Sequence, residues 1–217
     1  YADHLFIGHD NILYKSIDGG SNFDTLYSFP SGGRVYEMEQ SREDYAVLYV
    51  VFEANYESNN ARDIYKSTDG GTSFSLLTVL PGNRNKIEIS LNPLDKEEIW
   101  AGMGDGANGS KVYKSLDGGI NWTNMSSSSL DGESIKDIKY QGGSDDLVYV
   151  ATYNSVFYYD NNISDWIEYG SGLPLVAKSL KLNPFYRDAE LRLGSTGRGV
   201  FSRKMADTLF SPIAQPI

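Results

Sequence analysis

The sequence has no cysteine, no long apolar run and a shortage of basic residues. Its 217 residues include 19 Lys and Arg against 29 Asp and Glu, which gives a formal net charge of -10. This balance argues against nucleic acid and anionic membrane surfaces as partners, because basic patches bind both. The absence of cysteine excludes disulfides and thiolate metal sites. No stretch approaches the roughly 18 consecutive apolar residues that indicate a membrane span.

What the sequence does contain favours many short strands. Glycine occurs 22 times and tyrosine 16 times, and aromatic residues make up 13% of the chain. A chain of this length can bury a core as one β-domain. It opens at Tyr1 in the middle of a strand-like pattern, so we expect it to be part of a longer protein.

One eight-residue phrase occurs three times, at 16–23, 67–74 and 115–122. It reads Ser-x-Asp-Gly-Gly-x-x-Phe or Trp, and each copy follows a short apolar run that ends in Tyr-Lys. Asp-Gly between two such runs predicts a β-hairpin.

Each residue type in the phrase has a role in a tight turn. Glycine supplies positive φ angles, the Asp carboxylate accepts hydrogen bonds from backbone N–H groups, and the Ser hydroxyl caps the loop. The final aromatic ring can hold the second strand against the sheet. We therefore interpret these residues as structural: Ser16, Asp18, Gly20, Phe23, Ser67, Asp69, Gly71, Phe74, Ser115, Asp117, Gly119 and Trp122.

The phrase resembles the Asp-box (BNR repeat), S-x-D-x-G-x-x-W/F. This repeat occurs in sialidases, sortilin-type receptors, xyloglucan-specific endoglucanases and plant photosystem-assembly factors. In those families the box is a folding device shared by enzymes and non-enzymes. The resemblance therefore implies a fold and does not name a function.

A decayed fourth copy ends at Trp166, so the aromatic residues are spaced by 51, 48 and 44 residues. In this copy Asn161 and Asn162 replace the Asp-Gly-Gly turn, since asparagine tolerates the left-handed conformation. A period of this size with about four strands per unit is typical of a β-propeller. We expect an all-β propeller of four-stranded antiparallel blades.

Three blades should be complete, with outer strands at 74–80 and 122–126 in the second and third. Two incomplete blades should flank them, the first without its inner strand and the last without its outer strand. Sequence before Tyr1 would supply the last outer strand, in a ring of about six to eight blades. The alternative is a small five-bladed ring with incomplete ends.

The last part of the chain carries a second resemblance. The segments 172–174, 182–184 and 191–201, which ends Thr-Gly-Arg-Gly-Val-Phe, are similar to the closing blade of secreted Bacteroidetes Asp-box proteins. This implies a secreted or cell-surface bacterial protein. We expect the propeller over 1–205, an extension or linker over 206–217, and other domains of the same larger chain as partners.

Blade topology separates two sets of loops. With strands A to D running from inside to outside, the B–C and D–A loops share the face where propellers usually bind ligands, and the repeated hairpins lie on the other face. Polar loops with scattered tyrosines suit a carbohydrate, although surface loops of any propeller are polar. The candidate ligand-binding residues are His9, Asp10, Tyr56, Arg62, Arg84, Asp105, Asn108, Tyr153 and Arg198.

No motif on these loops demands catalysis. Glycoside hydrolysis usually needs two carboxylates, and Asp105 is the best single candidate, with Asp10, Glu53 and Glu57 as partners. Asp105 and Asn108 could also offer oxygens to Ca²⁺, but the loop lacks the acidic density of a dedicated site. We therefore expect no catalytic residue, metal or cofactor, with calcium as the alternative.

Three functions stay open. The short loops and the lack of a paired-carboxylate motif favour a non-catalytic binding or scaffold propeller of a secreted or cell-surface bacterial protein, with a glycan or protein as ligand. The second is the propeller portion of a polysaccharide-active glycoside hydrolase. The third is a sortilin-like or assembly-factor-like propeller that binds protein.

Overall fold

The computed structural model describes residues 3–54, 61–77, 80–81, 85–144, 146–171, 173, 179–196 and 199–206. Regular structure in these residues consists of strands and two short 3-10 turns, η1 (Ser128–Leu130) and η2 (Tyr186–Asp188). In the same residues, no helix has the length and apolar character needed to cross a membrane.

The strands form five antiparallel sheets in chain order. The first holds β1 (Leu5–His9), β2 (Ile12–Ser16) and β3 (Asp24–Ser28). The second holds β4 (Arg34–Gln40), β5 (Leu48–Glu53), β6 (Arg62–Ser67) and β7 (Ser75–Leu76). The third holds β8 (Ile87–Asn92), β9 (Asp95–Met103), β10 (Val112–Ser115) and β11 (Thr123–Asn124).

The fourth sheet holds β12 (Ile135–Tyr140), β13 (Val148–Thr152), β14 (Val156–Asp160) and β15 (Asp165–Glu168). The fifth holds β16 (Ser179–Phe185), β17 (Glu190–Ser195) and β18 (Gly199–Lys204). Among the described residues, the second, third and fourth sheets thus have four strands each, and the first and fifth have three each. The division into a propeller over 1–205 and an extension over 206–217 stays a prediction. The outer strands are shorter than expected, since β7 and β11 each cover two residues. They lie at the sheet edge and pair with one neighbour only.

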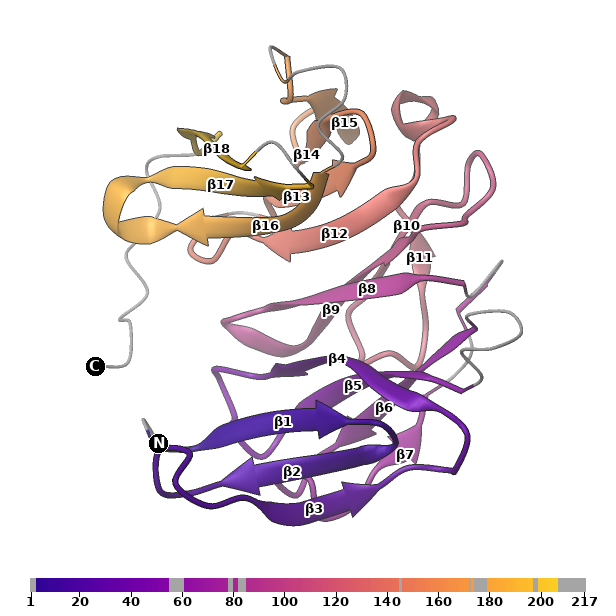
Figure 1. Cartoon of the computed structure of the whole chain (residues 1–217). Helices are drawn as coiled ribbons and strands as arrows, with labels where there is room; N and C mark the ends of the chain where they lie inside the picture. Colours follow the sequence, from indigo (N-terminus) through magenta and orange to yellow (C-terminus); the bar gives the residue numbers. More distant parts are fainter. Residues whose placement is uncertain are drawn as a thin grey trace.

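The sheets are arranged like blades around an axis. In Figure 1 they follow one another from β1–β3 near the bottom to β16–β18 at the upper left, with the inner strands β4, β8, β12 and β16 in successive contact. One apolar cluster fills each of the four spaces between neighbouring sheets. Because strand β5 is buried along its whole length, both faces of its sheet must be covered.

The repeated hairpins are held by hydrogen bonds from their own side chains. The Ser67 hydroxyl donates to Asp69 Oδ1 at 2.8 Å and accepts from the Gly71 N–H at 2.9 Å. Asp69 Oδ1 also accepts from the Ser73 N–H at 2.9 Å. The hairpins at 16–23 and 115–122 repeat these bonds. These residues therefore make the turn itself, as their chemistry predicts.

Gly71 shows why glycine is needed in this loop. Its φ is +94°, and a Cβ at this position would lie 2.5 Å from Leu26 Cδ2 of the preceding sheet. The hairpin therefore combines a left-handed backbone with close approach to the preceding blade.

The fourth hairpin forms without the repeated phrase, but not by the expected route. Strands β14 and β15 pair, and Asp160 Oδ1 accepts from the Asn162 N–H at 2.9 Å. The residue with positive φ is Ser164, at 52°, so the expectation of a left-handed asparagine at 161 or 162 was wrong. The Asp160 carboxylate holds the start of the loop, and the reversal occurs just before β15.

Replacing Ser67 by alanine should lower the free energy of unfolding by about 1–3 kcal/mol, because the buried Gly71 N–H loses its acceptor. Urea unfolding measures this loss. Ser31→Ala, at an exposed serine between β3 and β4, is the control. Equal stability of the two variants would show that the hydroxyl does not hold the hairpin.

The hairpin carboxylates should also make stability depend on pH. Hydrogen bonds from Asn22, Ser73 and Asn121 lower the pKa of Asp18, Asp69 and Asp117 to about 2. The unfolded value is about 4, so each contribution is complete above about pH 4 and is lost as the pH falls through about 2.

Asp69→Asn should therefore show a smaller loss of unfolding free energy than the unsubstituted chain between about pH 5 and pH 2. Urea titrations at both pH values measure the difference. Asp24→Asn, at an exposed position on β3, should keep the full pH dependence. The expectation fails if both variants respond alike.

Candidate functional site

The two ends of the sheets carry different loops. The repeated hairpins meet the region where the first two strands of their sheets are joined. There the Gly70 N–H donates to Ala46 O, in the β4–β5 loop, and the Gly118 N–H donates to Glu97 O, near the start of β9, both at 2.9 Å. The opposite end, called the loop face below, holds the turns after β1, β5, β9, β13 and β17 and the connections between sheets. Candidates Tyr56, Arg84 and Arg198, together with Glu57, lie outside the described residues.

His9 and Asp10 occupy the turn between β1 and β2 at one end of the loop face. His9 Nδ1 lies 3.7 Å from Asp10 Oδ2, and both side chains are exposed. Asp10 has a positive φ of 47°, and its carbonyl accepts from the Val35 N–H at 2.7 Å. The backbone of Asp10 thus links the first sheet to the second, and both side chains face solvent.

Asp105 and Asn108 lie in the β9–β10 loop, where each side chain has a different partner. Lys86 Nζ lies 2.9 Å from Asp105 Oδ1. Asn108 Oδ1 accepts from the Gly132 N–H at 2.9 Å, which joins this loop to the segment after η1. A shared calcium ion stays a prediction, and Asp105 would have to exchange its lysine partner for the ion.

Two tyrosine rings are partly exposed beside cations. Tyr153, between β13 and β14, is 44% exposed, and Lys136 Nζ lies 3.7 Å from its ring centroid. Tyr36 on β4 is 39% exposed, and the Arg62 guanidinium lies 3.2 Å from its ring centroid. These cation–π contacts fix the rings and leave part of each accessible.

Arg62 is the first residue of β6, and its side chain is buried instead of extending from the loop. It contacts Glu53 Oε2 at 3.5 Å through Nε, and Ile87 O and Glu88 Oε1 at 2.9 and 3.1 Å through Nη1. Glu53 is also buried, and one of its carboxylate oxygens has no hydrogen-bond partner. Arg62 thus joins the second sheet to the third.

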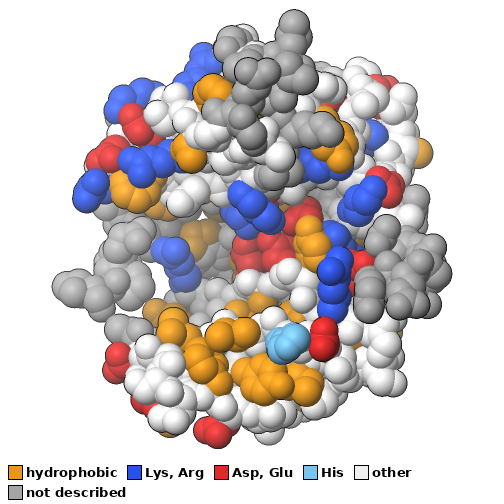
Figure 2. Space-filling model, in the orientation of Figure 1, with side chains coloured by type: hydrophobic (Ala, Val, Ile, Leu, Met, Phe, Trp, Pro, Cys, Tyr) orange, Lys and Arg blue, Asp and Glu red, His pale blue; other side chains and the backbone are white. Residues whose placement is uncertain are grey.

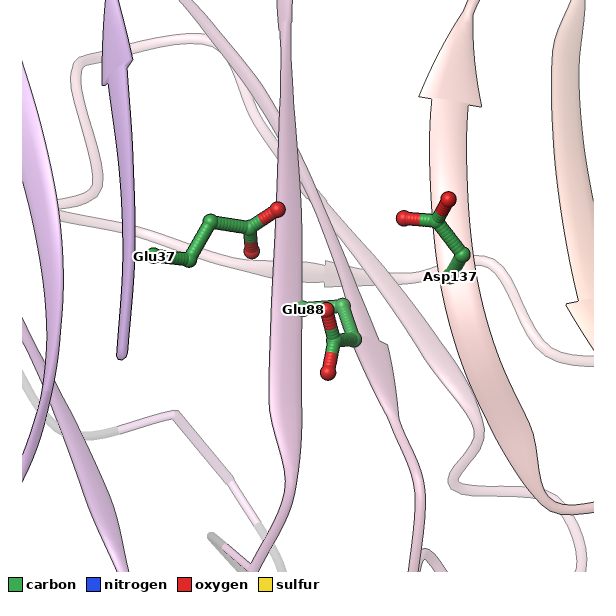
Figure 3. Close-up of side chains that lie close together, drawn as sticks. All are labelled: Glu37, Glu88 and Asp137. Carbon is green, nitrogen blue, oxygen red and sulfur yellow. The ribbon is translucent and has the colours of Figure 1, made fainter. Parts of the chain in front are cut away.

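An acidic cluster on the inner strands was not among the residues predicted from the sequence. Glu37 on β4, Glu88 on β8 and Asp137 on β12 each bring one carboxylate oxygen within 4.8 Å of the others (Figure 3). Figure 2 shows acidic side chains gathered near the middle of this view, bordered by Lys and Arg. The three residues occur one repeat apart, so the spacing of acidic residues on consecutive inner strands was the signal available in the sequence.

These carboxylates connect neighbouring blades. Glu37 Oε2 accepts from the Ile89 N–H at 3.0 Å, and Asp137 Oδ2 accepts from the Leu182 N–H at 2.6 Å. In both cases a side chain of one inner strand satisfies a backbone donor of the next. Glu88 instead binds Arg62.

Two lysines reach across the axis to the same cluster. Lys139 of the fourth sheet lies 3.6 Å from Glu37 and 3.0 Å from Glu39 of the second, and Lys181 of the fifth lies 3.0 Å from Glu88 of the third. Burial raises the pKa of Glu37, and the nearby Lys139 opposes this shift. Although burial disfavours its charged form, Glu39 and Asp137 raise the pKa of Lys139. Because lysine and backbone N–H groups already bind these oxygens, the arrangement fits a structural cluster better than a metal site.

Comparison with known proteins supports the fold. No family model matches the chain. A xyloglucanase of Hypocrea jecorina (strain QM6a) is 28% identical over 157 residues, which cover 71% of this chain and 18% of that protein. The chain therefore spans less than a fifth of the length of this curated relative.

Solved structures with the same fold include an ancestral GH74 enzyme, with a TM-score of 0.72 and 15% identity over 93% of this chain and 29% of that one. YCF48 from Cyanidioschyzon merolae gives a TM-score of 0.66 and 15% identity over 97% of this chain and 66% of that one. The structure of YCF48 bound to D1 peptide gives a TM-score of 0.60 and 16% identity over 92% of this chain and 61% of that one. The chain is therefore a β-propeller, as the sequence predicted. Its blades are similar to those of GH74 and YCF48 propellers.

Removing Asp137 should destabilise the fold strongly. Asp137→Ala leaves the Leu182 N–H without its acceptor and takes a carboxylate from beside Lys139 and Lys181. The expected loss is about 3–5 kcal/mol of unfolding free energy, measured in urea. Asp24→Ala removes an exposed carboxylate and is the control. Similar losses in both variants would contradict a structural role for the cluster.

Proposed function

We propose that the chain is the binding propeller of a secreted or cell-surface bacterial protein and recognises a polysaccharide through its loop face. The observation that carries this proposal is the pair of partly exposed tyrosine rings on that end of the molecule, Tyr153 and Tyr36. Sugar rings stack on aromatic faces and hydrogen-bond to polar groups beside them. The similarity to a xyloglucanase supports a plant-type glucan as the first ligand to test.

Tyr153 has neighbours suited to this role. Lys136 fixes the ring, and Asn154 Nδ2 lies 3.4 Å from both carboxylate oxygens of Glu133. The Asn154 amide is exposed and Glu133 is half-buried, and the two groups can exchange their mutual contact for sugar hydroxyls. The site would then combine one apolar ring with donors and acceptors at its edge, which is the usual composition of a carbohydrate subsite.

The carboxylates favour binding over hydrolysis. Asp105 is paired with Lys86, and the carboxylates of the inner strands are held by backbone N–H groups and cations. A retaining glycosidase places two carboxyl groups about 5 Å apart, and one must be free to attack the sugar. The acidic cluster approaches that spacing, but its oxygens are already engaged.

The second candidate is the propeller portion of a glycoside hydrolase. The xyloglucanase match favours it, because the remaining length of that protein could supply groups that this chain does not contain. A protein ligand is the third candidate, since a propeller of the same fold is known with a bound peptide. Whichever of these candidate functions applies, other domains of the same larger chain are proposed as further partners.

Tyr153→Ala should weaken binding of soluble xyloglucan by about 3- to 10-fold, the loss of one aromatic contact. Affinity electrophoresis and calorimetry measure the change. Tyr45→Ala is the matched control, because Tyr45 is 40% exposed but lies between β4 and β5 at the opposite end. If the two variants bound xyloglucan equally well, the loop face would not be the binding site.

A reducing-sugar assay on the same polysaccharide separates binding from cleavage. Binding without release supports the proposal. Release of reducing sugar by the unsubstituted chain, if Asp105→Asn abolished it, would establish the hydrolase instead. Failure to bind any glucan, together with capture of an extended peptide, would favour the protein ligand.

A further inference from the structure

A cavity of about 370 Å³ lies at the hairpin end of the fourth sheet, opposite the loop face. The end of β14 and the hairpin after it form one wall, and the β12–β13 loop and Ala206, just after β18, form the rest. Its volume falls within the range of about 300–1,000 Å³ that small-molecule sites occupy. Most of the residues that line it carry polar groups: Ser144, Tyr158, Tyr159, Asp160, Asn161 and Asn162.

The cavity lies at a position of the repeat where the first three sheets have a lysine. The residue eight positions before the aromatic residue of each hairpin is Lys15, Lys66, Lys114 or, in the fourth sheet, Tyr158. Each of these pairs in register with an aromatic residue of the second strand, namely Phe6, Tyr49, Trp100 or Tyr149. The four positions are therefore structurally equivalent, and of these four only the fourth has no cationic side chain.

In the second and third sheets this lysine lies between an aromatic ring and a carboxylate of the next sheet. Lys66 Nζ lies 5.3 Å from the Tyr49 ring centroid and 2.6 Å from Glu97 Oε2. Lys114 Nζ lies 5.1 Å from the Trp100 ring centroid and 2.5 Å from a carboxylate oxygen of the β12–β13 loop. An ammonium group at this position of the repeat is therefore stabilised both by a ring and by a negative charge.

The fourth sheet keeps the aromatic residue and has a carboxylate, but tyrosine replaces the lysine. The Tyr149 and Tyr158 ring centroids are 6.3 Å apart. Asp160 follows Tyr158 by two positions on β14, so both side chains point to the same face of the strand. Burial and the nearby Asp160 carboxylate raise the pKa of the Tyr158 hydroxyl. A negative charge therefore lies beside the position that the lysine occupies in the other sheets.

Several polar groups of this wall have no partner in the part of the chain that the structure describes. Asp160 Oδ1 accepts from the Asn162 N–H at 2.9 Å, whereas Oδ2 makes no hydrogen bond or ion pair with a described residue. The Tyr158 hydroxyl and the Asn161 side chain likewise make no hydrogen bond with described residues. Of the described residues that line the cavity, none is Lys or Arg, and Arg203 of β18 donates to a backbone carbonyl elsewhere. The lining therefore favours a cation that also carries hydroxyl groups.

We propose that this cavity binds a hexosamine, a six-carbon sugar with a free amino group. The sugar ammonium donates to Asp160 Oδ2, as Lys66 does to a carboxylate of the third sheet. The Asn161 and Asn162 amides, both exposed, and the half-buried Ser144 hydroxyl lie at the rim and bind the sugar hydroxyls. An amino sugar suits the cavity better than a simple alkyl amine, because only the sugar uses these rim groups. The site lies at the opposite end from the loop face and does not depend on the function proposed there.

Titration of the full chain with glucosamine tests the proposal, followed by the NMR signals of the Asn161 and Asn162 side-chain amides. The titration is run at about pH 6, where an aliphatic amine is protonated. Glucosamine should bind at least tenfold more tightly than glucose or N-acetylglucosamine, because a charged hydrogen bond contributes about that factor. Equal affinity for the three sugars would overturn the proposal.

Two substitutions locate the binding in the cavity, with urea unfolding to show that each variant is folded. Asp160→Asn should weaken glucosamine binding about tenfold. Asp95→Asn is the matched control, because Asp95 Oδ1 also accepts from the N–H two residues on, at 2.9 Å, but lies outside the cavity. Tyr158→Lys should abolish binding, since the chain then supplies the ammonium as it does at 66 and 114. Unchanged binding in Tyr158→Lys, or equal losses in the two Asp variants, would contradict the proposal.

Two further measurements separate this site from other sources of an amine and from the loop face. The amide of N-acetyl-lysine carries an ammonium group without a sugar ring, and it should bind about tenfold more weakly than glucosamine. Equal affinity for the two would assign the cavity to a lysine side chain and overturn the hexosamine. Tyr153→Ala should leave glucosamine binding unchanged, so a failure of the loop-face site and a failure of this one are distinguishable.

Discussion

The need to cover both faces of each sheet organises this molecule. Strands such as β5 and β13 are buried throughout, so neither face of their sheets can be left to solvent. Each sheet meets this need by packing on the one before and the one after it, and an apolar cluster fills each space. The repeated hairpins serve the same packing, since Gly71 approaches Leu26 and Trp122 enters the cluster of the preceding space.

The fold could be predicted because its signal is local. The Ser-x-Asp-Gly-Gly phrase makes its own hydrogen bonds within eight residues, so its chemistry can be interpreted without tertiary information. The spacing of the aromatic residues then gives the period of the repeat. The fourth hairpin shows the limit of this approach. Its sequence indicated a turn, but the position of the left-handed residue, Ser164, depended on how Asp160 holds the loop.

The candidate site was less accessible to prediction because it is assembled across blades. Arg62 sits at the boundary of a loop, and one residue of difference in strand length decides whether it faces solvent or the next sheet. Glu37, Glu88 and Asp137 are about fifty residues apart, and only the curvature of the sheets brings them together. Tyr153 and Arg62 could be named from the sequence, but Tyr36 and the cation–π contacts that fix both rings could not.

The ion pairs at the axis have a consequence for how the chain unfolds. If sheets contacted only their neighbours, stability would be a sum of repeats and interfaces, and unfolding could begin at either end and spread inward. Lys139 joins the fourth sheet to the second, and Lys181 joins the fifth to the third. Unfolding of one blade therefore also removes ion-pair partners from a blade two positions away. This coupling favours a single cooperative transition over stepwise fraying of a linear array.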